Sequence, residues 1–183
     1  MNPETAFADE ALFPDAQPWD VVLDTLWGSY GEFWLVAGAG PGADVETAIP
    51  EREAVAGNGE AVGIPTVESA GRIAVVLSVW EAPAPDGLGV PLGSSRITGA
   101  GRELVLTNVE GREPSPVLVL PDEGEHEVAV WRLAPPGAGG PERYAVRVWP
   151  CPAGGGRGGA GFSTRTSTRG SRCGEGDLPM LEP

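Results

Sequence analysis

The segment PDEGEHE, residues 121–127, gathers several side chains that could do chemistry. Four carboxylates, Asp122, Glu123, Glu125 and Glu127, surround His126, the only histidine in the chain. Carboxylate oxygens and imidazole nitrogens are metal ligands, but this spacing matches neither a calcium loop nor a zinc motif. Because acidic and polar residues are also typical of turns, we interpret the segment as a solvated turn and predict no metal ion there.

Nucleophilic catalysis has little support. An activated serine or cysteine needs a positioned base, and the chain has one histidine, no lysine and no GxSxG motif. Both cysteines, Cys151 and Cys173, lie in a glycine-rich C-terminal segment. GAGPG at residues 38–42 lacks the spacing and the following helix of a phosphate-binding loop, so we interpret it as a turn. We therefore predict no enzymatic activity and no cofactor; a carboxylate-based hydrolase is the least favoured alternative.

Six tryptophans could form aromatic contacts with a protein or a carbohydrate. Trp80, Trp131 and Trp149 fall within or at the end of alternating apolar segments, which favours a place in the core. Trp27 and Trp34 flank the sequence GSYGEF and are our aromatic candidates for partner binding. The four carboxylates of residues 121–127 complete the set of candidate contact residues.

Short strands must position these side chains. GRIAVVLSVWEA at 71–82 is apolar on both faces, which predicts a central strand covered on both sides. We expect the last two strands, 124–136 and 142–150, to pair as an antiparallel hairpin, and we interpret residues 38–63 as a loop. The remaining expected strand segments are 19–38, holding one or two strands, 95–97, 102–109 and 114–121. Six to eight short strands with regular turn signals are typical of a β-sandwich or a small barrel, and we predict an antiparallel β-sandwich.

Composition divides the chain into three parts. Residues 1–18 are acidic and contain three prolines, which predicts an irregular lead-in to a β-sandwich domain at 19–150. Residues 151–183 are rich in Gly, Arg, Ser and Thr and have few apolar side chains, so we predict a disordered tail. One hypothesis for this abrupt change is an altered reading frame in a GC-rich gene; the other is an ordinary flexible tail.

The net charge of −14 is concentrated in the body of the protein. Residues 1–150 contain 8 arginines against 23 acidic residues, whereas residues 151–183 contain 4 arginines against 3. Such a body repels nucleic acid and anionic membranes and attracts basic partners, although acidic charge also serves solubility. The N-terminus has no signal-peptide pattern, and the longest apolar stretch, 73–80, is too short to span a bilayer, so we expect a cytoplasmic protein.

Several of these segments, taken in order, resemble the competence protein J family and its actinobacterial relatives. The segments are YGEFWLV, GRIAVVLSVWEA, VLPDEGEHEVAVWRLAP and ERYAVRVWP, spread over residues 25–150. The resemblance implies direct binding and inhibition of a DNA-entry nuclease, and it carries over no binding residue. The tail after Pro150 departs from the family pattern, in which relatives often continue in an ordered manner.

Our first hypothesis is a non-enzymatic binding protein, of inhibitor or immunity type, whose carboxylates compete for the nucleic-acid cleft of a basic nuclease. The alternative is a carbohydrate- or small-ligand-binding β-sandwich that uses the tryptophans.

Overall fold

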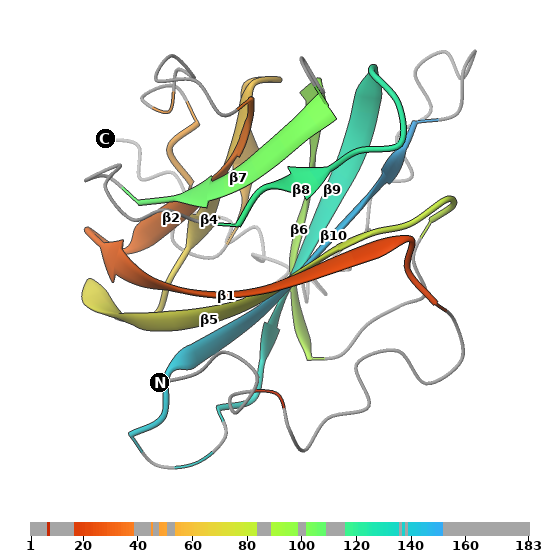
Figure 1. Cartoon of the computed structure of the whole chain (residues 1–183). Coiled ribbons are helices and arrows are strands. Elements are labelled where there is room, and N and C mark those ends of the chain that lie inside the picture. The colour runs from red at the N-terminus through yellow and green to blue at the C-terminus, as the bar shows by residue number, and fades with distance from the viewer. Residues whose placement is uncertain are drawn as a thin grey trace, which may run out of the picture.

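The structure is a computed structural model that describes Phe7 and residues 17–38, 45, 48–50, 54–83, 89–98, 102–108, 116–135, 137 and 139–151. These residues form ten β-strands and contain no α-helix (Figure 1). The strands are β1 (Asp20–Ser29), β2 (Glu32–Ala37), β3 (Ala56–Gly57), β4 (Ala61–Pro65), β5 (Ala70–Val79), β6 (Val90–Thr98), β7 (Glu103–Thr107), β8 (Leu118–Val119), β9 (Glu125–Leu133) and β10 (Glu142–Pro150). The described part of the chain has no helix long and apolar enough to cross a membrane. Most of residues 1–18, and the tail after Cys151, lie outside the described residues.

The strands form one mixed sheet that curls into a nearly closed barrel. One half has the order β1-β5-β10-β9-β6, in which only β5 and β10 run parallel. The other half pairs β3, β4, β2, β7 and β8 in antiparallel fashion. The β1–β2 hairpin joins the halves on one side. On the other side, Thr98 N–H donates to Gly59 O at 2.6 Å and Val55 N–H donates to Leu92 O at 3.3 Å.

The predicted all-β class is confirmed, whereas the arrangement differs from an antiparallel sandwich. Period-2 patterns identify strands, but they do not say which strands pair, and the parallel neighbours β5 and β10 are far apart in sequence. The two halves approach closely at Gly57, since a Cβ atom there would lie 2.1 Å from Ser95 Oγ and 3.0 Å from Ser95 Cβ on β6. A glycine in a segment taken for a loop therefore lets β3 approach β6 closely.

The predicted strand segments agree with the structure in some places and differ in others. The segment 19–38 forms two strands, and β9 and β10 pair antiparallel, as predicted. β3 and the first part of β4 lie within 38–63, which was interpreted as a loop. β4 was missed because it contains glycine and proline, which normally interrupt strands. β6 is longer than the expected 95–97, and it tolerates Pro91 and Gly93 through an irregularity in its register with β9.

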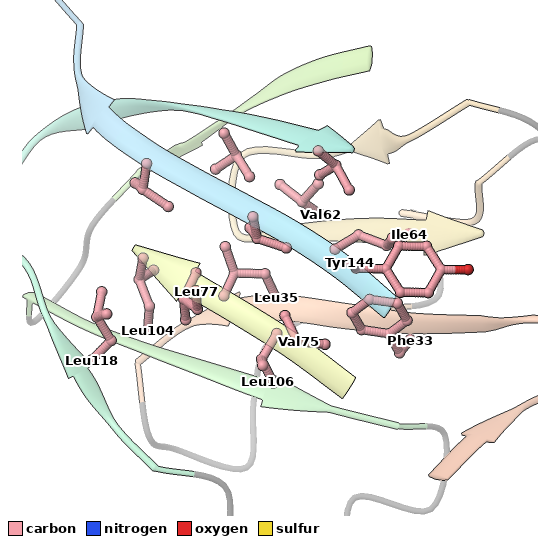
Figure 2. Packing of buried hydrophobic residues seen from close by; sticks show 14 of the residues in the cluster. Phe33, Leu35, Val62, Ile64, Val75, Leu77, Leu104, Leu106, Leu118 and Tyr144 are labelled. Carbon is pink, nitrogen blue, oxygen red and sulfur yellow. The ribbon is translucent and has the colours of Figure 1, made fainter. Parts of the chain in front are cut away.

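The barrel interior is filled by a continuous apolar cluster drawn from both halves of the sheet (Figure 2). Phe33 and Tyr144 meet edge to face, with ring centroids 5.2 Å apart and an interplanar angle of 68°. The predicted central strand β5 contributes Ile73, Val75 and Leu77 to this cluster. Its alternate residues are buried on the outer face, which confirms that β5 is covered on both sides.

Two smaller clusters cover parts of the outer surface. The first lies over β5, β9 and β10 and includes Phe7, so part of the lead-in packs on the barrel. Against this cluster, the guanidinium carbon of Arg147 lies 5.4 Å from the ring centroid of Trp80 and 5.2 Å from that of Trp131. The second cluster lies over β2 and β4, beneath the segment that contains Ala48.

Candidate protein-binding surfaces

The two ends of the barrel carry different surfaces, and β10 runs from one to the other. We call the turns at residues 30–31 and 66–69 the hairpin end, since they flank the β1–β2 connection; Glu142 begins β10 beside them. We call residues 122–127 the acidic end, where Pro150 lies opposite His126. The nine residues of β10 span about 26 Å between the two ends.

Hydrogen bonds tie the two turns of the hairpin end together. Thr66 N–H donates to Gly31 O at 2.8 Å, and Gly31 N–H donates to Ser69 O at 3.0 Å. The Glu142 carboxylate accepts bonds from the N–H groups of Val67 and Glu68 at 2.9 and 2.8 Å. One carboxylate thus holds two consecutive backbone amides, a charge-assisted arrangement that fixes the turn.

Tyr144 connects this carboxylate to the core. Its ring is buried among the interior residues, and its hydroxyl donates to Glu142. Burial first, and then the hydrogen bond to Glu142, raise the pKa of Tyr144 far above its ordinary value. On β2, at the other side of the β1–β2 turn, burial raises the pKa of Glu32. The Glu142 carboxylate is therefore linked directly to a core side chain.

Large apolar side chains nevertheless face solvent at the hairpin end. Tyr30 is 81% exposed, Val67 is 66% exposed and Trp27 is 47% exposed. Tyr30 also has a φ of 60°, and Gly31 follows with a φ of 85°. Two consecutive positive φ angles between Ser29 and Glu32 are typical of the mirror-image turns that connect twisted hairpins.

Carboxylates at the acidic end interact with side chains of the neighbouring strand β6. Glu125 and Arg96 form an ion pair at 3.3 Å, with both side chains about half exposed. Glu127 accepts a hydrogen bond from Ser94 Oγ at 2.9 Å. Asp122 and Glu123 are exposed to solvent. This end keeps a negative surface, although some of its carboxylates already have partners within the chain.

His126 is fully buried beneath this turn. Its Nδ1 lies 3.1 Å from Gly124 O, and its Nε2 lies 3.1 Å from Asp122 Oδ1. Nearby, Cys151 N–H donates to Glu125 O at 2.9 Å, and burial raises the pKa of the Cys151 thiol. His126 therefore joins the turn to the barrel. Among the described residues, no three His, Cys, Asp or Glu side chains are grouped so that they could hold a metal ion.

The candidate contact residues predicted from the sequence do not form one surface. Trp27 lies at the hairpin end, whereas the four carboxylates of residues 122–127 lie at the acidic end. Trp34 belongs to neither, because it is 3% exposed and its Nε1–H donates to Ala48 O at 3.3 Å. Trp34 is therefore not a surface contact residue, since a buried indole cannot contact a partner without rearrangement.

The exposed residues Tyr30 and Val67 were missed. The only sequence signal for Tyr30 was its position immediately before Gly31 in a turn. Of the three tryptophans predicted for the core, Trp80 and Trp131 are buried, and Trp149 packs partly buried against the outer cluster.

Two solved structures have a similar fold. The first, titled "Crocagin biosynthetic gene J", is 14% identical, with a TM-score of 0.51 over 72% of this chain and 97% of that one. The second is ComJ from Bacillus subtilis, titled an inhibitor of the DNA-degrading activity of NucA. It is 11% identical, with a TM-score of 0.50 over 74% of this chain and 98% of that one. No protein-family model and no curated protein matches the chain. At these identities the likeness shows the fold alone.

Proposed function

We propose that this protein is a non-enzymatic, cytoplasmic inhibitor that binds a basic nuclease. The observation that carries the proposal is a net charge of −14 on a fold similar to that of ComJ, an inhibitor of the DNA-degrading activity of NucA. Nucleases hold a polyanion in a positively charged cleft, and an acidic protein competes for the same field.

The chemistry of the described residues supports binding rather than catalysis. The only histidine, His126, is buried with an oxygen atom near each ring nitrogen, so it is poorly placed to activate a nucleophile in solvent. The barrel interior is filled by aliphatic and aromatic side chains. Contacts with a partner would therefore be made by surface residues of the barrel.

Nuclease inhibition tests the proposal directly. The full chain would be titrated into DNA-degradation assays containing NucA of Bacillus subtilis or other nucleases with a net positive charge. We expect stoichiometric inhibition of at least one nuclease, with affinity falling as NaCl rises from about 50 to about 500 mM, because salt screens exposed charges.

A polyglutamate chain of equal net charge is the matched control, since it reproduces the charge without the fold. Equal inhibition by polyglutamate would reduce the effect to nonspecific electrostatics. No binding to any nuclease of the panel at low salt would overturn the proposed function.

A further inference from the structure

Tyr30 adopts a backbone conformation that its residue type disfavours. Its φ of 60° lies in the left-handed region, where glycine and asparagine are accommodated far better than an aromatic residue. Strain of this kind persists only where surrounding structure enforces it, and it is concentrated at functional sites. Since the Tyr30 side chain is 81% exposed, packing within the described fold gives it little compensation.

The scaffold beneath Tyr30 is held in place. The next residue, Gly31, exchanges backbone hydrogen bonds with the 66–69 turn, and Glu142 holds the amides of Val67 and Glu68 from the other side. Preorganisation of this kind lowers the entropy lost when a surface binds a partner. Tyr30 and Val67 are thus exposed on linked turns, with Trp27 three residues before Tyr30 on the adjoining strand.

We propose that the hairpin end anchors the basic nuclease, with the exposed side chains of Tyr30, Val67 and Trp27 as its contacts and Tyr30 as the main one. This inference rests on the proposed function and names the surface that performs it. Tyrosine and tryptophan dominate the energetics of protein interfaces, because they bury large, rigid areas. They also bind arginine and lysine side chains through cation–π contacts, which suits a basic partner.

The acidic end then contributes long-range attraction. Rim charges mainly alter the association rate and its salt dependence, whereas desolvated anchors set the dissociation rate. Glu125 and Glu127 already interact with Arg96 and Ser94, which reduces what a partner gains by pairing with them. The net charge selects a basic partner in preference to a second copy of this chain, since two copies at −14 repel one another.

The test uses Tyr30→Asn in the full chain. Asparagine followed by Gly31 suits this mirror-image turn, so we expect the melting temperature to rise by about 2–4 °C. The same variant should bind the nuclease at least about tenfold more weakly, mainly through faster dissociation, as expected when an interface anchor is removed. Glu123→Gln at the acidic end is the matched control, with an expected change in affinity of less than about threefold.

A stabilised Tyr30→Asn variant with weakened binding would support the inference, and restored affinity in Tyr30→Phe would show that the aromatic ring is responsible. If Tyr30→Asn bound as tightly as the wild type, the inference would be overturned while the proposed function stood. A large loss confined to Glu123→Gln would also overturn it, since the acidic end would then be the anchor. If the wild-type chain bound no nuclease, the proposed function would fail and the inference with it.

Discussion

At the hairpin end, one carboxylate, that of Glu142, accepts hydrogen bonds from two backbone amides and a buried tyrosine hydroxyl. At the acidic end, four carboxylates lie within six residues, yet the ion pair of Glu125 with Arg96 is half exposed. Both arrangements join distant parts of the chain, but Glu142 holds two backbone amides and the hydroxyl of a core tyrosine, whereas the ion pair joins two side chains that are about half exposed. The number of acidic residues at an end therefore says little about how much they stabilise it.

The two ends also differ in the side chains that they expose to solvent. The hairpin end exposes Tyr30, Val67 and Trp27 on a hydrogen-bonded frame, whereas beneath the acidic end the buried His126 ties the turn to the barrel. A rigid end with exposed aromatic residues suits short-range recognition, and a charged end suits long-range attraction. In the proposed mode of binding, short-range contacts and long-range attraction thus come from different ends of one barrel.

The largest difference in stability is expected from neutralising one carboxylate at each end. Glu142→Gln should lower the free energy of unfolding by about 2–3 kcal/mol, because an amide cannot accept from two backbone N–H groups as a carboxylate does. Glu125→Gln, the matched control, should cost less than about 1 kcal/mol. Urea denaturation of both variants measures the contrast, and equal losses would show that the two ends do not differ in this way.

The sequence predicted where the strands lie better than it predicted which strands pair. Alternating apolar residues located β5, β9 and β10 and assigned their faces correctly, because burial follows the period of two. Pairing depends on contacts between distant segments, so the parallel β5–β10 pair and the closure beside Gly57 left no local signal. β4 was missed because its glycine and proline resemble a loop, although Gly63 serves the close approach of Ala48 O.

The candidate surfaces were predicted only in part. The acidic turn was visible as a run of charges, and Trp27 was correctly left outside the core. Trp34 has the same residue type, but the segment containing Ala48 covers it, and local sequence does not reveal such a cover. Glu142 was not singled out, because a lone glutamate at the start of a strand gives no sign of the distant amides it will hold.

Alkaline pH should act on the hairpin end through Tyr144. Its pKa is raised in the folded state, so above its ordinary value of 10.0 the unfolded chain releases a proton that the folded chain retains. The free energy of unfolding should therefore fall as pH rises, by up to about 1.4 kcal/mol per pH unit. Tyr144→Phe should remove this dependence, while costing about 1 kcal/mol at neutral pH through the lost hydrogen bond to Glu142.

The measurement is urea denaturation between about pH 9.5 and 11, where the unfolded phenol titrates. Both chains would carry Cys151→Ser, because burial also raises the pKa of that thiol and would add its own alkaline destabilisation. An unchanged pH dependence in Tyr144→Phe would show that the fold does not hold the Tyr144 hydroxyl protonated. The hydrogen bond from Tyr144 would then not distinguish the hairpin end from the acidic end.

The smallest effect is expected for the ion pair at the acidic end. A double-mutant cycle of Arg96→Gln and Glu125→Gln should give a coupling free energy of about 0.5 kcal/mol or less, since solvent screens two half-exposed side chains. That coupling should vanish in high salt, because salt screens exposed charges. The loss of unfolding free energy in Glu142→Gln should persist there, because the short hydrogen bonds to the amides of Val67 and Glu68 are screened less than an exposed ion pair. A coupling above about 1.5 kcal/mol would mean that the acidic end is as firmly organised as the hairpin end. Its carboxylates would then be preorganised for short-range contacts with a partner, and not only for long-range attraction.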